Sequence, residues 1–328
     1  MLSELLIFET FDADPYRNLA VEAALMEALH PGQCLLYLWQ NDRTVVIGRN
    51  QDAERECRIA LLEQEDGRLA RRPSGGGAVY HDLGNLNFTF LVAERDYDPE
   101  QQLSVLLGAV RAAGVQAVQS GRNDLLAGGR KISGSAFLRR DGRHCHHGTL
   151  LVSVDLDRLT RYLDVQPDKL QAKGVASVRA RVANLTEFCP GLTTDRMRAL
   201  LKESAEQVFG LPAQAPPGGM PDPAAVAIHA ARFASAEWRL GRRFPAQREL
   251  HRRFDWGDIR LLLALEGGRI AQAAAFSDAL EADFIAELPA ALTGPAGDPV
   301  STLRTLAGDH PLRRRMADDI AALLAEAL

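Results

Sequence analysis

The chain has 328 residues, of which 46% are hydrophobic and 25% charged, a balance typical of a soluble protein with a packed core. Its 38 basic and 43 acidic residues give a net charge of −5, which speaks against nucleic acid as the main partner, because such proteins usually carry a basic face. The length favours two domains. Residues 1–9 lack the pattern of a signal peptide, and no apolar run reaches about 18 residues, so we expect a cytoplasmic protein without a membrane span.

The first elements are predicted to alternate strand and helix. A strand over residues 1–9 precedes a helix that begins at Asp14, because Asp-Pro is a favourable pair at a helix start. Strands over residues 34–39 and 44–48 follow, and then a helix over residues 59–67. Trp39 lies at a strand end, where it either packs in the core or lines an apolar ligand tunnel, since a flat rigid ring suits an alkyl chain.

The segment 71–81 (RRPSGGGAVYH) carries three consecutive glycines after two arginines. Successive backbone N–H groups in such a bend can hold phosphate or carboxylate oxygens. The segment lacks the Gly-Lys-Ser/Thr end of a P-loop and the third glycine of a dinucleotide fingerprint, and a strand follows it. A glycine-rich hairpin turn is the structural alternative. Pro73 removes one N–H donor and stiffens the segment.

A second polar segment follows a predicted helix over residues 100–113 and a strand over residues 115–118. In the run 120–136 (SGRNDLLAGGRKISGSA), Lys131 lies between two turns of small residues, where its ammonium can reach an oxyanion. The alternative is an exposed lysine on an edge strand. The histidine cluster 144–147 (HCHH) then enters another strand. We expect His144 and His146 to face solvent, and no zinc site, because a second pair of ligands is missing.

The remaining chain is predicted to be mainly helical. The segment 173–185 (KGVASVRARVANL) suits a flap over an anion, or else a solvated helix face. Its neighbours are a helix that Asp155 caps and a helix from Thr194 to Phe209. Past a Pro- and Gly-rich stretch at residues 211–223, we predict a helix, a hairpin and three further helices over residues 224–235, 258–273, 281–292, 299–307 and 311–327. This part has no convergent polar cluster, which indicates a support or lid domain.

Five blocks of this sequence resemble the lipoate-protein ligases, most closely the two-domain bacterial type: RLARRPSGGGAVYHDLGN, SGRNDL, RKISGSA, HHGTLL and KGVASVRARVANLTE. The resemblance implies an α+β fold, with a catalytic domain at residues 1–246 built on a mixed sheet flanked by helices. A small α/β accessory domain would occupy residues 252–328. The implied reaction is ATP-dependent formation of lipoyl-AMP and transfer of the lipoyl group to a lysine of a carrier, with release of AMP. The implied carriers are the lipoyl domains of 2-oxoacid dehydrogenase complexes and the glycine-cleavage H protein.

The resemblance also assigns roles to individual residues. Lys131 would be the catalytic residue, because a cation must lie between the lipoate carboxylate and the α-phosphate when two anions meet in a low dielectric. The expected contacts of ATP or the adenylate are Arg72, Gly75, Gly76, Gly77, Ala78, Val79, Tyr80, Asn123, Asp124, Lys131 and Lys173. Those of lipoate are Trp39, Ser74, His81, Lys131, Gly134, Ser135 and His147. Asp124 is the candidate ligand of Mg²⁺, which would accompany ATP, and no permanently bound cofactor is expected.

Three alternatives stay open on the sequence. An ATP-independent octanoyl- or lipoyl-transferase of the same fold would need a cysteine or lysine, and Cys145 is the nearby thiol. A biotin ligase is a second possibility within the fold. A non-catalytic lipoate-binding protein is the third, although a protein that only binds lipoate has no need of the bridging Lys131.

Overall fold

The computed structural model describes residues 2–121, 123–164, 181–219, 221–241, 244–267, 269–293 and 299–326. Lys173 and most of the predicted flap lie outside these ranges. The chain divides into two compact units. The first consists of Met1–Val46, Glu54–Ala70 and Val79–Arg239, and the second of Ile47–Ala53, Arg71–Ala78 and Leu240–Leu328. The glycine-rich segment therefore groups with the C-terminal part of the chain.

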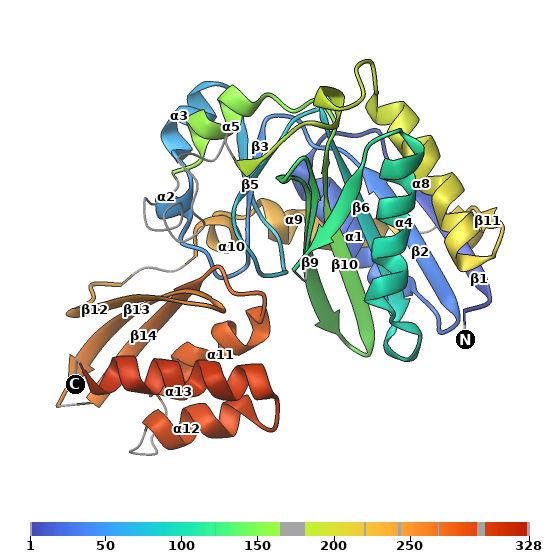
Figure 1. Ribbon diagram of the computed structural model, residues 1–328. Helices are drawn as coiled ribbons and strands as arrows, with labels where there is room; N and C mark the ends of the chain where they lie inside the picture. The colour runs from blue at the N-terminus through green and yellow to red at the C-terminus, as the bar shows by residue number, and fades with distance from the viewer. Residues whose placement is uncertain are drawn as a thin grey trace. The chain divides into compact units, whose positions relative to one another are not determined.

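An eight-stranded mixed sheet forms the centre of the first unit (Figure 1). Its first two pairings, β11 with β1 and β1 with β2, are parallel, and the pairings from β2 through β6, β10, β9 and β8 to β7 are antiparallel. In sheet order the strands are β11 (Ala213–Gln214), β1 (Glu4–Glu9), β2 (Gln33–Trp39), β6 (Asn85–Ala93), β10 (Arg143–Leu151), β9 (Arg130–Arg140), β8 (Asp124–Ala127) and β7 (Ala117–Ser120).

Helices cover both faces of this sheet. Along β2, Leu36 and Leu38 point into the core beneath α4 (Pro99–Ala112) and α8 (Thr194–Phe209), whereas Leu35 and Tyr37 point into the core beneath α1 (Pro15–Ala28) and α9 (Pro223–Ala234). Successive side chains of a strand alternate between faces. Both faces of β2 are buried, and the strand is accordingly apolar from Cys34 to Trp39. Figure 1 shows α4 and α8 together on one face of the sheet and α1 on the other.

Short elements complete the first unit. A three-stranded sheet has the order β4-β3-β5 and lies near small helices, one of which, α5, packs on β5. Asp14 and Asp155 cap α1 and α5 as predicted, since each carboxylate accepts backbone N–H groups of the first helical turn. These elements are β3 (Thr44–Ile47), β4 (Arg68–Arg71), β5 (Val79–His81), α2 (Ala53–Glu56), α3 (Ile59–Gln64), α5 (Leu156–Tyr162), α10 (Ala236–Leu240) and the 3₁₀ turns η1 (Glu94–Asp96), η2 (Leu185–Glu187) and η3 (Pro217–Gly219).

The C-terminal part of the second unit is an antiparallel sheet of order β12-β13-β14 packed on helices. Ile259, Leu261 and Leu263 of β13 alternate with less buried residues and contact the helices through one face. The elements are β12 (Arg248–Phe254), β13 (Gly257–Glu266), β14 (Arg269–Ser277), α11 (Ala282–Thr293), α12 (Pro299–Ala307) and α13 (Pro311–Ala325). The predicted α+β class, a large helix-flanked mixed sheet with a small C-terminal domain, is confirmed. Among the described residues, no helix has the length and apolarity to span a bilayer.

Candidate active site

Lys131 and Asp124 form an ion pair on neighbouring strands of the first unit. The ammonium nitrogen of Lys131 lies 2.7 Å from Oδ1 of Asp124, and the two side chains are 20% and 19% exposed. Nη2 of Arg181 lies 3.7 Å from Oδ2 of the same carboxylate. One partly buried carboxylate therefore faces two cations, which leaves a surplus of positive charge that suits an anionic ligand.

The local backbone explains where the Lys131 side chain lies. A register shift between Leu125 and Leu126 interrupts the pairing of β8 with β9 next to Lys131. Gly134 supplies the room, because a Cβ at this position would lie 2.5 Å from Nζ of Lys131. The backbone of Lys131 also bridges to Val182, and the N–H of Ala183 donates to its carbonyl at 2.9 Å. The end of the predicted flap is thus fixed to the strand that carries the lysine.

Two hydrogen bonds, one from a backbone N–H and one from a side chain, join Asn123 and Ser135 close to this ion pair. The N–H of Ser135 donates to the carbonyl of Asn123 at 2.7 Å, and Nδ2 of Asn123 donates to the carbonyl of Ser135 at 3.3 Å. In this structure the Asn123 side chain therefore holds the strand pair that positions Asp124. Its predicted contact with the nucleotide stays a prediction.

A buried polar chain links Trp39 to His147. Nε1 of Trp39 donates to Oγ1 of Thr89 at 3.0 Å, and this hydroxyl donates to Oε2 of Glu22 at 2.7 Å. Nδ1 of His147 lies 2.8 Å from the same carboxylate oxygen. Trp39 and His147 are thus held in fixed orientations, and Trp39 is a core residue that also belongs to this polar chain. Glu22 and Thr89 were not predicted from the sequence. The available signal was a single carboxylate within the apolar helix segment 19–26.

His81 lies beside this chain. Its Nδ1 is 3.2 Å from Nδ2 of Asn41, whose Oδ1 accepts a hydrogen bond from Nδ2 of Asn18 at 3.1 Å. The rings of His81 and Trp39 meet edge to face with centroids 6.4 Å apart. Because an amide nitrogen can only donate, this contact assigns Nδ1 of His81 as the acceptor and places the proton on Nε2. Asn18 and Asn41 were also missed on the sequence.

The prediction that His146 faces solvent is wrong. His146 is fully buried, with Nδ1 2.9 Å from Oε1 of Gln102 and its ring among Phe88, Phe90 and Phe137. Burial lowers the pKa of His146 to about 3. Both faces of β10 are covered, so alternation along the strand buries this ring on the face opposite that of Cys145 and His147. His144, which stacks on Tyr97 at 3.9 Å, is only partly exposed.

In the second unit, two buried arginines shape the glycine-rich segment. Nη1 of Arg71 donates to the carbonyls of Arg49 at 2.9 Å and Gln51 at 2.6 Å, and burial lowers the pKa of Arg71 to about 10. Arg72 donates to Oγ of Ser74 at 3.1 Å and to the carbonyl of Gly75 at 2.7 Å. Both guanidinium groups thus bind main-chain or hydroxyl oxygens of their own unit. The predicted contact of Arg72 with phosphate stays a prediction.

The glycines of this segment have different steric needs. Gly76 has φ +90°, which favours glycine, and its N–H donates to the carbonyl of Ala279 at 3.3 Å. A Cβ on Gly75 would overlap the same carbonyl, whereas a Cβ on Gly77 would have no neighbour within 4 Å. Gly75 and Gly76 therefore permit a close approach to the segment around Ala279. Ala78 ends this part of the second unit.

Val79 and Tyr80 belong to the first unit, on β5. The ring of Tyr80 is buried against Tyr162, with centroids 5.5 Å apart, and burial raises the pKa of the Tyr80 hydroxyl to about 12. Tyr80 is therefore neutral at physiological pH. At 3% exposure the residue packs inside the first unit, and its predicted contact with the nucleotide stays a prediction.

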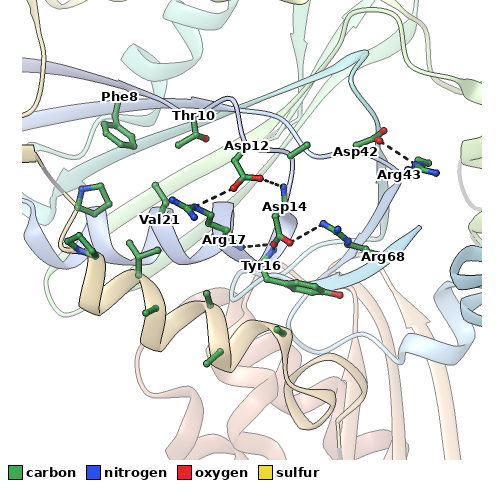
Figure 2. A pocket seen from close by; sticks show the side chains of 18 of the residues that line it. Phe8, Thr10, Asp12, Asp14, Tyr16, Arg17, Val21, Asp42, Arg43 and Arg68 are labelled. Carbon is green, nitrogen blue, oxygen red and sulfur yellow. Dashed lines mark hydrogen bonds and ion pairs between the residues drawn. The ribbon is translucent and has the colours of Figure 1, made fainter. Parts of the chain in front are cut away.

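A cavity of about 1030 Å³ in the first unit lies between the loop after β1 and helix α9 (Figure 2). Its charged lining residues pair with one another: Arg17 lies 3.4 Å from Asp12, and Arg68 lies 3.0 Å from Asp14. None of the predicted site residues lines it. This cavity is therefore separate from the candidate site.

The fold and these groups define a class of protein: an α+β domain whose central sheet carries the Lys131–Asp124 pair, in a chain that also has a glycine-rich segment. The chain belongs to the lipoate-protein ligase family. Residues 14–206 match the lipoyl protein ligase A/B catalytic domain, and residues 245–305 match the bacterial lipoate protein ligase C-terminus. The predicted resemblance is thereby confirmed.

Solved structures agree with this assignment. The P. falciparum protein LipL1, in complex with lipoate, is 21% identical, with a TM-score of 0.83 over 98% of this chain and 99% of its own, and shows the same fold. A bipartite lipoate protein ligase from Thermoplasma acidophilum, described with its E2 lipoyl domain as an archaeal lipoylation system, is 30% identical. It covers 75% of this chain and 99% of its own, with a TM-score of 0.65. A lipoate-protein ligase A bound with ATP is 28% identical, with a TM-score of 0.64 over 74% of this chain and 99% of its own.

Proposed function

We propose that this protein activates lipoate with ATP and transfers the lipoyl group to a lysine of a carrier domain. In the first step a carboxylate oxygen of lipoate bonds to the α-phosphorus of ATP, and pyrophosphate leaves. In the second step the ε-amine of the acceptor lysine bonds to the acyl carbon, AMP leaves, and the amine nitrogen loses a proton. Membership of the lipoate-protein ligase family and the ATP-bound relative support this reaction.

The Lys131–Asp124 pair is the observation that carries the proposal. Both reactants of the first step are anions, and their repulsion in a partly buried site is relieved by a cation between them. Lys131 lies where Gly134 makes room for its side chain, and Asp124 holds its ammonium group. When the substrates bind, the lipoate carboxylate and the α-phosphate would contact the ammonium group while Asp124 keeps it in place. Lys131 acts in this scheme as the catalytic residue.

The remaining contacts that we propose are those expected from the sequence. For the nucleotide we propose Arg72, Gly75, Gly76, Gly77, Ala78, Val79, Tyr80, Asn123, Asp124 and Lys173, of which Lys173 lies outside the described residues. For lipoate we propose Trp39, Ser74, His81, Gly134, Ser135 and His147. Residues 1–246 would form the catalytic domain and residues 252–328 the accessory domain.

Asp124 is also the group proposed to hold Mg²⁺ beside the ATP phosphates. Its two carboxylate oxygens are the donor type that Mg²⁺ prefers, and a single carboxylate together with substrate phosphates is a usual magnesium site. The ion would neutralise charge on the phosphates. Lys131 and Arg181 already contact this carboxylate, so Asp124 would orient one or both cations as well.

The buried state of Cys145 argues against a transferase that uses this cysteine. A thioester intermediate needs a thiolate, but burial and the charge of Glu22 raise the pKa of Cys145 well above its usual value.

The archaeal relative is described together with its E2 lipoyl domain as a lipoylation system. As acceptors of the lipoyl group here we propose lipoyl domains of 2-oxoacid dehydrogenase complexes and the glycine-cleavage H protein.

Lipoate-dependent exchange of pyrophosphate with ATP tests the first step. We expect exchange with lipoate and none without it, and a carrier domain should gain the mass of one lipoyl group when ATP is present. Transfer from an acyl-carrier thioester without ATP would instead identify a transferase. Binding of lipoate with neither exchange nor transfer would identify a non-catalytic binding protein.

A further inference from the structure

Glu22, Cys145 and His147 bring three different metal-binding groups to one point inside the first unit. One ligand atom from each lies within 4.8 Å of the other two. The residues are 3%, 1% and 5% exposed, respectively. In the part of the chain that the structure describes, this is the one set of three such groups that meets this distance. A carboxylate, a thiol and an imidazole together are typical ligands of zinc.

The fold explains why these three groups meet. Cys145 and His147 are two positions apart on β10, so they point to the same face of the sheet. That face is covered by α1, which contributes Glu22. The sequence offered only the spacing of Cys145 and His147, and the third ligand comes from a residue more than one hundred positions away.

The surroundings of Glu22 resemble the outer shell of a metal site. Oγ1 of Thr89 donates to Oε2 of Glu22 at 2.7 Å and itself accepts from Nε1 of Trp39 at 3.0 Å. Such outer hydrogen bonds orient a ligating carboxylate and are a regular part of metal centres. Glu22 is thereby held with one oxygen 2.8 Å from Nδ1 of His147.

We propose that Glu22, Cys145 and His147 bind a thiophilic divalent cation such as Zn²⁺, and that the bound ion excludes the acyl substrate. On binding, the Cys145 thiol releases its proton to solvent. The proton between His147 and Glu22 leaves Nδ1 while Nε2 of the same imidazole takes up a proton, so that neutral His147 binds the ion through Nδ1. Two negative ligands then balance the two positive charges of the ion inside the core. Ligand atoms around tetrahedral zinc are about 3.5 Å apart, so Nδ1 of His147 and Oε2 of Glu22, which lie 2.8 Å apart, must separate by small side-chain rotations when the ion binds.

The second half of the proposal, exclusion of the substrate, rests on the proposed function, because Trp39 and His147 are proposed there as lipoate contacts. An ion bound to His147 would change the charge and the free space around Trp39 and His147, where lipoate is proposed to bind. Three protein ligands also leave one coordination position for water, as in open zinc sites. The ion would therefore act as an inhibitor whose effect lipoate relieves.

Metal binding can be measured on the full-length protein without any activity assay. After treatment with a chelator, the protein is titrated with Zn²⁺ in competition with a chromogenic chelator, and with Co²⁺, whose thiolate complexes absorb in the near ultraviolet. We expect one equivalent of Zn²⁺ per chain and a thiolate–cobalt band. Cys145→Ser should weaken Zn²⁺ binding more than about ten-fold and abolish the band. Cys189→Ser, which changes a cysteine outside the cluster, should leave both unchanged.

Two outcomes would overturn the site: an absence of stoichiometric Zn²⁺ binding to the wild-type protein, or a cobalt band that persists in Cys145→Ser. Cys145→Ala serves as a second variant, and thermal unfolding verifies that each variant is folded.

Zn²⁺ should also inhibit lipoate-dependent exchange in the wild-type protein but not in Cys145→Ser, and excess lipoate should displace the ion. If Zn²⁺ binds stoichiometrically and lipoate does not displace it, the proposal that the ion excludes the acyl substrate would be wrong. If the ion binds at Cys145 while exchange is absent altogether, the proposed function fails and the metal site stands.

Discussion

Lys131 and Asp124 face each other across the pairing of β8 with β9, with the ammonium nitrogen 2.7 Å from a carboxylate oxygen. The pair is four-fifths buried, so its attraction is screened less than that of a surface pair. Asp124 thereby holds the position of Lys131, the cation that we propose as catalytic. Arg181 approaches the same carboxylate.

The first prediction concerns Asp124 itself. Asp124→Asn removes a charge-assisted contact worth about 2 kcal/mol, so we expect lipoyl-AMP formation to fall roughly 30-fold and the Mg²⁺ concentration for half-maximal rate to rise. Steady-state exchange at varied Mg²⁺ measures both. Glu187→Gln is the matched control. Glu187 pairs with Arg130, the residue before Lys131, and this pair is more exposed than the Lys131–Asp124 pair. Equal effects of the two variants would contradict the assigned role.

The second prediction separates position from stability at two glycines. In Gly134→Ala the new Cβ displaces the flexible end of Lys131, so we expect loss of adenylate formation with little change in thermal stability. In Gly148→Ala the new Cβ meets the carbonyl of Gly134 and the ring of Phe88, neither of which can move easily, so unfolding should shift instead. Exchange rates and melting temperatures distinguish the two. An active Gly134→Ala enzyme would show that the lysine position is not required.

The third prediction concerns the buried chain from Trp39 to His147. Trp39→Phe keeps an aromatic ring but removes the donor to Thr89, a buried hydrogen bond worth about 1 kcal/mol. We expect KM for lipoate to rise about five-fold while kcat changes less. Trp238→Phe, which alters a partly buried ring at the margin of the same core, is the control. An unchanged KM in Trp39→Phe would remove Trp39 from the lipoate contacts.

The fourth prediction is a pH dependence of stability. The pKa of His146 is about 3 in the folded protein, below the ordinary value of 6.5, so the unfolded chain binds the additional proton between these two values. The contribution of the neutral, buried His146 to stability is therefore present above pH 6.5 and is lost as pH decreases toward 3, by up to about 1.4 kcal/mol per pH unit. Urea unfolding at pH 7, 6 and 5, with a chelator present, should show this slope. His146→Gln cannot titrate and should flatten it; the same slope in both proteins would assign the effect elsewhere.

The sequence predicted what depends on local pattern. The cap at Asp14, the helices that become α4 and α8, and the strand that carries Lys131 follow from capping residues and apolar spacing. β12 was not predicted, because its sequence RELHRRF lacks the apolar alternation of a half-buried strand.

Residues of the site that depend on tertiary pairing could not be predicted. Glu22 lies on a helix and contacts His147, 125 positions away, and Gln102 contacts His146 from another helix. His146 was misjudged for the same reason, since only the sheet order shows that β10 is covered on both faces. The grouping of Arg71–Ala78 with the C-terminal unit likewise depends on long-range contacts of Gly76 that no local pattern encodes.

Lipoate-dependent pyrophosphate exchange by Lys131→Met is the sharpest test of the catalytic role of Lys131. Methionine keeps much of the length and apolar stem of the side chain but removes the ammonium group. We expect the exchange rate to fall at least about 100-fold, while Lys202→Met, which changes a lysine paired with Glu9, keeps its activity. A folded Lys131→Met protein that exchanges pyrophosphate at the wild-type rate would contradict the proposed role of Lys131.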